Sequence, residues 1–349
     1  MIKHLLKLPL LPVSWIYGAV VSTRNKLFDI GILKSTDFEV PTICIGNITT
    51  GGTGKTPLTE FTIEQISKHF STACLSRGYK RKTEGFVLAT KYSSTKEIGD
   101  EPKQIKNKFP NIMVAVDEDR VHGINKLLEL ENKPQVIVLD DAFQHRYVNS
   151  GKKIVLIDYN RPVYKDNLLP YGRLREKMSA LRRADIIIIT KCPRDLKPID
   201  QNILTKEFNL KAFQKIYFTY VDYDIIHDIN GYKIDSEITR NSNILCVTGI
   251  ANAQSYINEL KELGANVTHL EFSDHHNYTT HDIETIEKAF NKLSGDNKCI
   301  FTTEKDIMRL KEMNLPENIK ENIYYLPIKP KFFNKENEFI NEILTYCKG

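Results

Sequence analysis

The stretch that decides the fold is Ile43-Cys44-Ile45-Gly46-Asn47-Ile48-Thr49-Thr50-Gly51-Gly52-Thr53-Gly54-Lys55-Thr56-Pro57. A β-branched, apolar run leads into a glycine-rich loop, and the loop ends in Gly-Lys-Thr before a helical pattern. Glycines let backbone N–H groups approach phosphate oxygens, and a helix N-terminus adds positive potential there. The order of strand, loop and helix therefore predicts a site for a nucleoside triphosphate.

Individual residues of this loop fit particular parts of a nucleotide. Lys55 is placed to reach the β- and γ-phosphates, and the Thr56 hydroxyl is placed to bind Mg²⁺. We predict that eight consecutive residues hold the nucleotide: Thr49, Thr50, Gly51, Gly52, Thr53, Gly54, Lys55 and Thr56. The usual P-loop has a glycine six residues before the lysine, where this chain has Thr49.

Two pairs of acidic residues are candidates for chemistry. Asp140 and Asp141 end the apolar run 136–139, and an acid at such a strand end holds Mg²⁺ in P-loop enzymes. A strand-end aspartate alone is often only a turn residue. Asp100 and Glu101 lie on a loop before a helix. They fit a general base or a metal ligand, and they fit equally well the preference for acids in a first helical turn.

Basic and histidine-containing loops complete the candidate set. The loop 168–176 contains Arg173 and Arg175, and arginine forks suit phosphate groups, although a solvated surface loop is the alternative. Asp274-His275-His276 follows a strand, and we interpret a histidine there as one that orients a base. Zinc is disfavoured, because no third or fourth ligand stands at the usual spacing.

Apolar runs of strand length recur along the first half of the chain with helix-length spacers. They lie at 42–45, 72–75, 112–116, 136–139, 154–157 and 186–190. Continuous runs of Val, Ile and Leu are typical of strands buried on both faces. We therefore predict an α/β fold of the P-loop NTPase type, with a mostly parallel, doubly wound sheet.

The pattern changes after residue 215. The runs 215–220 and 224–234 alternate, and Asn230-Gly231 predicts a β-hairpin. Strands at 244–247, 267–272 and 299–302 and helices at 253–263, 282–293 and 335–346 follow, with Thr279 and Asp282 as a capping box. We predict a membrane-associated helical segment (1–35), a P-loop core (36–215), a β-hairpin linker (216–240) and a second, smaller α/β domain with a closing C-terminal helix (241–349).

The composition limits the kind of protein. With 41% hydrophobic and 27% charged residues, the chain has the composition of an ordinary globular protein, long enough for about two domains. Its net charge of +5 gives no indication of nucleic-acid binding. Six scattered cysteines without a Cys-x-x-Cys pair favour reduced core residues of a cytosol-facing protein over disulfides.

The apolar stretch Leu5–Val21 predicts contact with a membrane surface. It is too short and too interrupted to predict a spanning helix, and it lacks a convincing cleavage site. Basic residues flank it, and Trp15 and Tyr17 lie within it, which is typical of a helix among anionic headgroups. A core helix of a soluble domain is the alternative.

A series of motifs runs through the chain in order: Gly46-Asn47 with Thr50–Pro57, Ser76-Arg77-Gly78-Tyr79, Gly99-Asp100-Glu101-Pro102, Asp119-Arg120-Val121, Asp140-Asp141-Ala142-Phe143-Gln144-His145-Arg146, Leu169-Pro170-x-Gly172-x-Leu174-Arg175-Glu176, Thr248-Gly249-Ile250-Ala251-Asn252, Asp274-His275-His276 and Thr302-Thr303-Glu304-Lys305-Asp306. This series, which extends to about residue 310, resembles the tetraacyldisaccharide 4′-kinase family, the lipid A 4′-kinases of Gram-negative bacteria. Thr49 is ordinary for that family.

The resemblance implies a phosphotransferase with an alcohol group as acceptor. ATP, with Mg²⁺, would phosphorylate the 4′-hydroxyl of tetraacyldisaccharide 1-phosphate and give lipid IVA. The catalytic residues that it implies are Asp100, which accepts the hydroxyl proton, His275, which orients or shares it, and the cations Lys55 and Arg175. The metal and its waters would be held by Thr56, Glu101, Asp140 and Asp141, and Arg120 is a further candidate for binding phosphate charge.

The resemblance also implies partners and a location. The substrate would be a lipid-linked acylated glucosamine disaccharide, met at the cytoplasmic face of the inner membrane by a peripheral or monotopic protein. No nucleic acid and no obligate protein partner is expected. Because Asp100 falls within 36–215 and His275 within 241–349, we expect the two to meet by bending at the linker 216–240, which would gate catalysis.

Two other classes of protein fit parts of the sequence. A P-loop NTPase switch or metallochaperone-type protein would need the same loop and Asp140-Asp141, but no lipid acceptor. Thr190-Lys191 with Asp195 is similar to the guanine-reading Asn-Lys-x-Asp motif, although the spacing and the first residue differ. A membrane-associated scaffold that only binds nucleotide is the third class. Four intact residues argue against it: Lys55, Thr56, Asp100 and Asp140.

Overall fold

The computed structural model describes residues 9–274 and 276–349. These residues form two compact units. Unit 1 comprises the described part of Met1–Tyr92 together with Ile105–Val221 and Pro330–Gly349, and unit 2 comprises Ser93–Gln104 and the described part of Asp222–Lys329. The chain therefore passes from one unit to the other four times.

Unit 1 is built on a sheet of nine strands among the described residues, in the order β15-β8-β7-β6-β1-β5-β2-β4-β3. The strands are β1 Thr42–Asn47, β2 Thr72–Ser76, β3 Val87–Leu88, β4 Met113–Val116, β5 Val136–Asp140, β6 Lys152–Asp158, β7 Ile186–Thr190, β8 Lys215–Tyr223 and β15 Ile328–Phe332. The pairs from β8 to β4 are parallel, and β3 is antiparallel at the edge. The prediction of a mostly parallel α/β sheet is confirmed.

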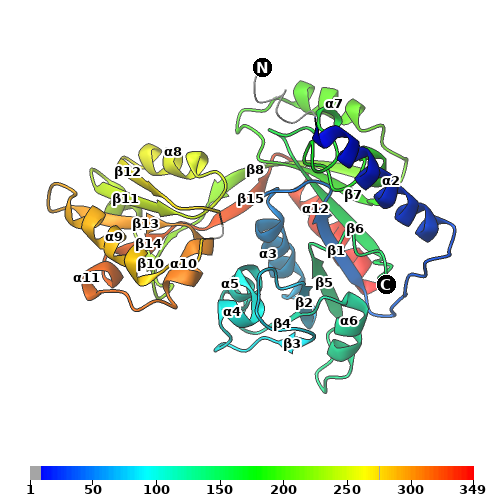
Figure 1. The fold of residues 1–349 in the computed structure, drawn as a ribbon, viewed down its shortest axis with the longest axis horizontal. Helices are drawn as coiled ribbons and strands as arrows, with labels where there is room; N and C mark the ends of the chain where they lie inside the picture. Colours follow the sequence, from blue (N-terminus) through cyan, green and yellow to red (C-terminus); the bar gives the residue numbers. More distant parts are fainter. Residues whose placement is uncertain (1–8, 275) are drawn as a thin grey trace. The chain divides into compact units, whose positions relative to one another are not determined.

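The helices of unit 1 cover a sheet whose central strands are mainly apolar and buried. They are α2 Leu10–Asp29, α3 Lys55–Ile66, α6 Arg120–Leu128, α7 Pro198–Glu207 and α12 Glu336–Lys348, with 3₁₀ turns at Val163–Lys165 and Met178–Arg183. Every residue of β1, β2, β5 and β7 is buried, as expected for strands covered on both faces. Strand β1 lies between β6 and β5 in the middle of this sheet, with α3 directly after it (Figure 1).

Unit 2 has a smaller sheet of six strands among the described residues, in the order β10-β9-β14-β13-β11-β12. Its strands are β9 Ile226–Asp228, β10 Lys233–Ile234, β11 Asn243–Thr248, β12 Asn266–Glu271, β13 Lys298–Thr302 and β14 Ile323–Tyr325. Its helices are α4 Thr95–Ile98, the first half of α5 Asp100–Lys108, α8 Gln254–Glu262, α9 Thr280–Asn291, α10 Glu304–Leu310 and α11 Glu317–Lys320, with a 3₁₀ turn at Ser236–Thr239. The hairpin of β9 and β10 and the capping box of Thr279 and Asp282 are found as predicted.

The C-terminal helix belongs to unit 1, whereas we predicted it as the closing element of the smaller domain. The reason is aromatic packing. The ring of Phe339 on α12 lies 6.2 Å from Phe61 on α3 and 4.9 Å from Phe332 on β15. The hydroxyl of Tyr346 donates to the carbonyl of Thr42 at 3.1 Å, which ties the helix to the start of β1.

Two other predicted boundaries also differ. Residues 216–221, predicted as the start of the linker, belong to unit 1, because β8 pairs in parallel with β7 and extends the first sheet. Residues 93–104, predicted within the P-loop core, belong to unit 2. There the hydroxyl of Thr95 donates to Glu312 at 2.7 Å, and Gln104 donates to Glu304 at 3.2 Å.

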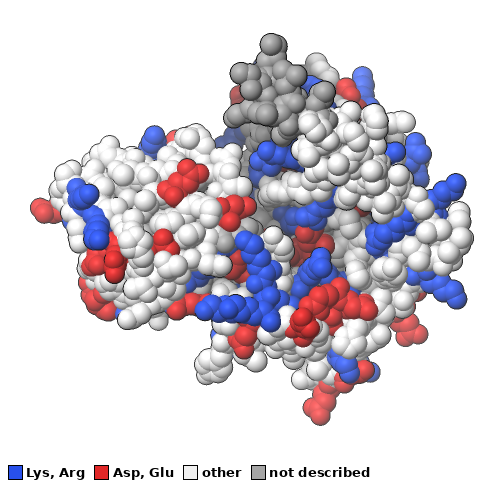
Figure 2. Space-filling view, in the orientation of Figure 1, with Lys and Arg blue, Asp and Glu red and all other residues white. Residues whose placement is uncertain are grey.

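Charged side chains of both signs are interspersed over the face shown in Figure 2. Such mixing agrees with the small net charge of +5. Among the described helices, none combines the length and the apolar character that crossing a membrane requires.

Candidate active site

The loop between β1 and α3 has the backbone geometry of a phosphate cradle. Gly51 and Gly54 have φ of +96° and +86°, which only glycine adopts without strain. A Cβ on Gly52 would meet no atom within 4 Å, so this part of the loop is open. At Gly46 the opposite holds, because a Cβ there would lie 2.6 Å from Cβ of Phe143. The open part of the loop thus follows a strand that is tightly packed at Gly46.

A cluster of opposite charges lies at the start of α3. Nζ of Lys55 lies 3.7 Å from Oδ1 of Asp141, and Nη1 of Arg175 lies 3.2 Å from the same oxygen. Burial raises the pKa of Asp141, but the charges of Lys55 and Arg175 outweigh burial and hold that pKa below its usual value. The structure therefore brings together three of the residues that the sequence indicated.

Asp140 and Asp141 are adjacent in the chain, but their side chains contact different residues. Asp140 is buried and accepts a hydrogen bond from the Thr59 hydroxyl at 3.0 Å. Asp141 has a positive φ of 48°, which turns its side chain toward the two cations. Among the residues that the structure describes, no three His, Cys, Asp or Glu side chains form a metal cluster.

The donor set still fits Mg²⁺. This ion keeps several waters and is usually bound by one or two carboxylates together with substrate phosphates, so no complete protein cage is needed. The oxygens of Thr56, Asp140 and Asp141 are of the hard type that Mg²⁺ prefers, and the open glycine cradle has room for the phosphates. Glu101, predicted in the same set, belongs to unit 2 and pairs with Lys305 at 3.2 Å.

The loop carrying Arg175 is fixed by polar contacts with α2 and with the segment after β5. Nε2 of Gln144 donates to the carbonyl of Asn47 at 2.8 Å and to the buried Glu176 at 2.9 Å. Glu176 also accepts from Nδ2 of Asn25 on α2 at 2.7 Å. The hydroxyl of Tyr17 on α2 donates to the carbonyl of Arg175 at 3.0 Å. Helix α2 is therefore part of the support of this site.

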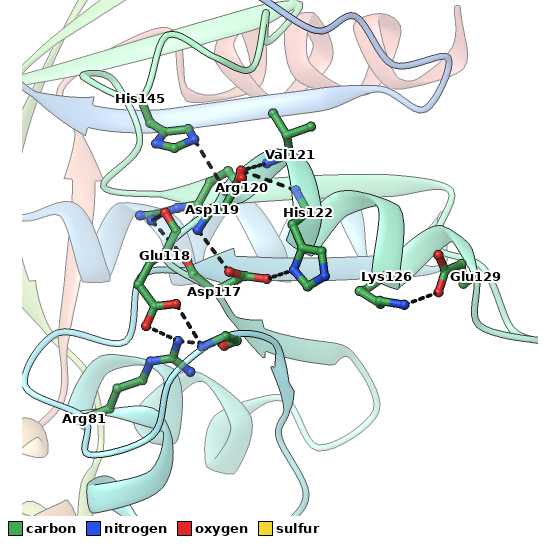
Figure 3. A network of polar contacts seen from close by, with 11 residues as sticks. Arg81, Asp117, Glu118, Asp119, Arg120, Val121, His122, Lys126, Glu129 and His145 are labelled. Atoms are coloured by element: carbon green, nitrogen blue, oxygen red, sulfur yellow. Dashed lines mark hydrogen bonds and ion pairs between the residues drawn. The ribbon is translucent and has the colours of Figure 1, made fainter.

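Arg120 is buried and belongs to a polar network at the start of α6 (Figure 3). Its side chain donates to the carbonyls of Asp117 and Glu118 at 3.1 and 3.2 Å, and its Nε has no partner among the described residues. The ring of His145 faces the backbone N–H of Arg120 at 3.4 Å (Figure 3). Burial, followed by the charge of Arg120, lowers the pKa of His145 to about 4. His145 is therefore neutral near pH 7.

Asp100 lies in unit 2, where Arg309 on α10 donates to its carboxylate. The same guanidinium donates to the carbonyl of His276 at 3.3 Å and to Oδ1 of the fully buried Asp306 at 3.3 Å. His275 lies outside the described residues. His276 has a structural partner, since its Nε2 lies 3.0 Å from Asp282.

The position of Asp100 bears on the expected hinge. We expected Asp100 in the core 36–215, but Ser93–Gln104, which contains it, belongs to unit 2. Because His275 lies outside the described residues, bending at 216–240 stays a prediction.

Neither Arg309 nor the contact of Thr190 and Lys191 with the P-loop was predicted from the sequence. Arg309 stands three residues after Asp306, the last residue of the last motif, and on the same face of a short helix, so this spacing could have predicted their contact. The side chains of Thr190 and Lys191 donate to carbonyls of the P-loop. Only the order of strands in the sheet brings that pair to the loop.

Comparison with known proteins finds similarity over nearly the whole chain. The family model for tetraacyldisaccharide-1-P 4′-kinase matches residues 6–348. A protein of Bacteroides thetaiotaomicron named tetraacyldisaccharide 4′-kinase is 47% identical over 99% of this chain and 95% of its own length. A protein of the same name from Flavobacterium johnsoniae is 44% identical over 99% of this chain and 98% of its own length. A crystal structure of LpxK from Aquifex aeolicus in complex with ATP superposes with a TM-score of 0.77 at 28% identity, over 97% of this chain and 99% of that one.

Proposed function

The chain belongs to the tetraacyldisaccharide-1-P 4′-kinase family, and we propose that the residues around Lys55 and around Asp100 divide the work of that family's reaction. The protein is a kinase that uses ATP and Mg²⁺ to phosphorylate the 4′-hydroxyl of tetraacyldisaccharide 1-phosphate in lipid A biosynthesis. The observation that carries the proposal is the group of Lys55, Asp141 and Arg175 beside the open glycine loop.

We propose that unit 1 holds the phosphoryl donor. The amides of residues 49–56 bind the phosphates, and Lys55 stabilises charge on the β- and γ-phosphates. Thr56, Asp140 and Asp141 hold Mg²⁺, which neutralises phosphate charge when bound. Arg175 exchanges part of its contact with Asp141 for the transferred phosphoryl group.

We propose that Asp100 and His275 act on the acceptor. The 4′-hydroxyl gives its proton to the Asp100 carboxylate while its oxygen forms a bond to the γ-phosphorus and the bond to ADP breaks. His275 orients that hydroxyl or shares its proton. Support comes from Arg309, which binds both the Asp100 carboxylate and the carbonyl of His276, the residue next to His275. Glu101 stays a prediction as a metal ligand.

We propose that α2 meets the cytoplasmic face of the inner membrane. Trp15, Ile16 and Val20 on this helix are 68%, 66% and 63% exposed, which is unusual for large apolar residues outside an interaction surface. The opposite side of the helix supports the Arg175 loop through Ser14 and Tyr17. A helix with these two faces allows a peripheral or monotopic enzyme to reach a lipid acceptor at the bilayer surface.

The test is phosphoryl transfer from γ-labelled ATP to detergent-solubilised tetraacyldisaccharide 1-phosphate with Mg²⁺. Label on the lipid is expected with the unmodified protein, and Asp100→Asn and His275→Ala should each reduce it by at least about 100-fold, as removal of general-base catalysis does. Near-normal transfer in both variants would overturn the assignment of the two residues. Phosphate release without labelled lipid would instead favour an NTPase switch.

A further inference from the structure

A second lysine contacts the P-loop from a different strand. Strand β7 stands two places from β1 in the sheet, and it ends at Thr190. The hydroxyl of Thr190 donates to the carbonyl of Thr53 at 2.8 Å, and Nζ of Lys191 donates to the carbonyl of Gly52. Two consecutive carbonyls of the loop are thus bound by two consecutive side chains.

These two contacts set the direction of loop amides. In a planar trans peptide the C=O and the N–H of the next residue point in opposite directions. Holding the carbonyls of Gly52 and Thr53 toward β7 therefore turns the N–H groups of Thr53 and Gly54 the other way. Successive amides aimed into one concavity make an anion-binding nest, which is what phosphate oxygens require.

Lys191 is itself held in place. Its Nζ lies 3.1 Å from Oδ2 of Asp158, which is buried, and Oδ1 of Asp158 accepts from the backbone N–H of Asn160 at 3.0 Å. The backbone of Lys191 has a positive φ of 57°, a strained conformation for a residue with a side chain, and such strain persists where surrounding contacts enforce it. The ammonium of Lys191 is thus bound by Asp158 and by a carbonyl of the loop itself, whereas Nζ of Lys55 lies 3.7 Å from Asp141.

We propose that Lys191, together with Thr190, is a positioning residue for the nucleotide, which fixes the amides of Thr53 and Gly54 in their phosphate-binding direction. The proposal rests on ATP being the phosphoryl donor, and it assigns Lys191 no contact with the reacting atoms. We call the contacts of Thr190 and Lys191 with the carbonyls of Thr53 and Gly52 the brace. Losing the brace lowers affinity for the nucleotide and leaves affinity for the lipid acceptor unchanged.

The test is calorimetric titration of each variant with ADP and Mg²⁺, beside kinetics in both substrates. Lys191→Met keeps most of the aliphatic part of the side chain and removes the ammonium group. We expect ADP to bind about tenfold more weakly, which is the effect of losing about one charge-assisted hydrogen bond. Thr190→Val should weaken binding about threefold to tenfold, whereas Thr190→Ser, which keeps the hydroxyl, should restore it. The KM for ATP should rise in parallel with the KM for lipid constant. Lys206→Met, on an exposed position of α7, is the matched control.

The results of the ADP titration and of the lipid assay distinguish this proposal from the proposed function. Wild-type ADP affinity in both Lys191→Met and Thr190→Val would overturn the brace, whatever the lipid assay gives. Equal losses in Thr190→Val and Thr190→Ser would also overturn it, because the hydroxyl would then be irrelevant. ADP binding that follows the expected pattern in a protein without lipid phosphorylation would retain the brace and count against the kinase assignment.

Discussion

Replacing Arg309 by methionine removes one guanidinium that serves three acceptors. In the structure these are the Asp100 carboxylate, the carbonyl of His276 at 3.3 Å and Oδ1 of Asp306 at 3.3 Å. Asp306 is fully buried, so the substitution leaves a buried carboxylate without this cation. Breaking a buried ion pair in this way lowers the free energy of unfolding by about 3–5 kcal/mol. We therefore expect a folded but clearly less stable protein.

The effect on turnover distinguishes positioning from stability. If Arg309 orients Asp100, kcat in Arg309→Met should fall about 100-fold, the loss that a displacement of about 1 Å causes at a reacting group. The same substitution in an Asp100→Asn background should cost less than about threefold, because the group that it orients is already inactive.

The assay is initial-rate label transfer at saturating ATP, well below the melting temperature of each variant, with thermal unfolding measured in parallel. Arg240→Met, at an exposed arginine of the same unit, controls for loss of surface charge. Two results would refute the reasoning. One is a wild-type kcat in Arg309→Met. The other is a double variant in which the two single effects multiply.

Three further predictions concern unit 1. Gly46→Ala should lower the free energy of unfolding by about 1–3 kcal/mol in denaturant titration, because its Cβ would meet Phe143 at 2.6 Å, and an unchanged midpoint would contradict that packing. The pKa of Asp141 is lowered, since its cationic neighbours outweigh burial, so its stabilising contribution is complete above its unfolded pKa and is lost as pH falls through the lower folded value. Wild type should therefore lose stability relative to Asp141→Asn as pH falls below about 4, and parallel pH curves would contradict this. Ile16→Glu on α2 should reduce co-sedimentation with anionic vesicles while activity on a detergent-solubilised acceptor is retained, and equal sedimentation would place the membrane contact elsewhere.

The central sheet could be predicted because its signals are local. Most strands of the parallel core contain a continuous apolar run of about four residues. The glycine loop follows one of these strands directly, so neighbours in sequence are neighbours in structure. The sequence also predicted three residues of the site, because their types fit phosphate chemistry whatever the fold: Lys55, Arg175 and Asp141.

The domain boundaries were harder, because they depend on contacts between distant segments. The position of α12 depends on the aromatic contact of Phe339 with Phe61, which no local pattern of residues 335–346 indicates. The position of Asp100 depends on Arg309, more than two hundred residues later. In the sequence, Lys191 belongs to a segment that only partly matches a guanine-reading motif. Its contact with the P-loop depends on the order of the strands in the sheet, which the sequence does not reveal.

The exchange of segments between the two units has a consequence for the order of folding. The ribosome releases Asp222–Lys329 before it releases Pro330–Gly349, so unit 2 has its whole sequence while unit 1 still lacks β15 and α12. Until then Phe61 on α3 lacks its contacts with Phe332 and Phe339. The nascent nucleotide domain therefore leaves Phe61 on its P-loop helix without these ring contacts until the segment with Phe332 and Phe339 has been synthesised.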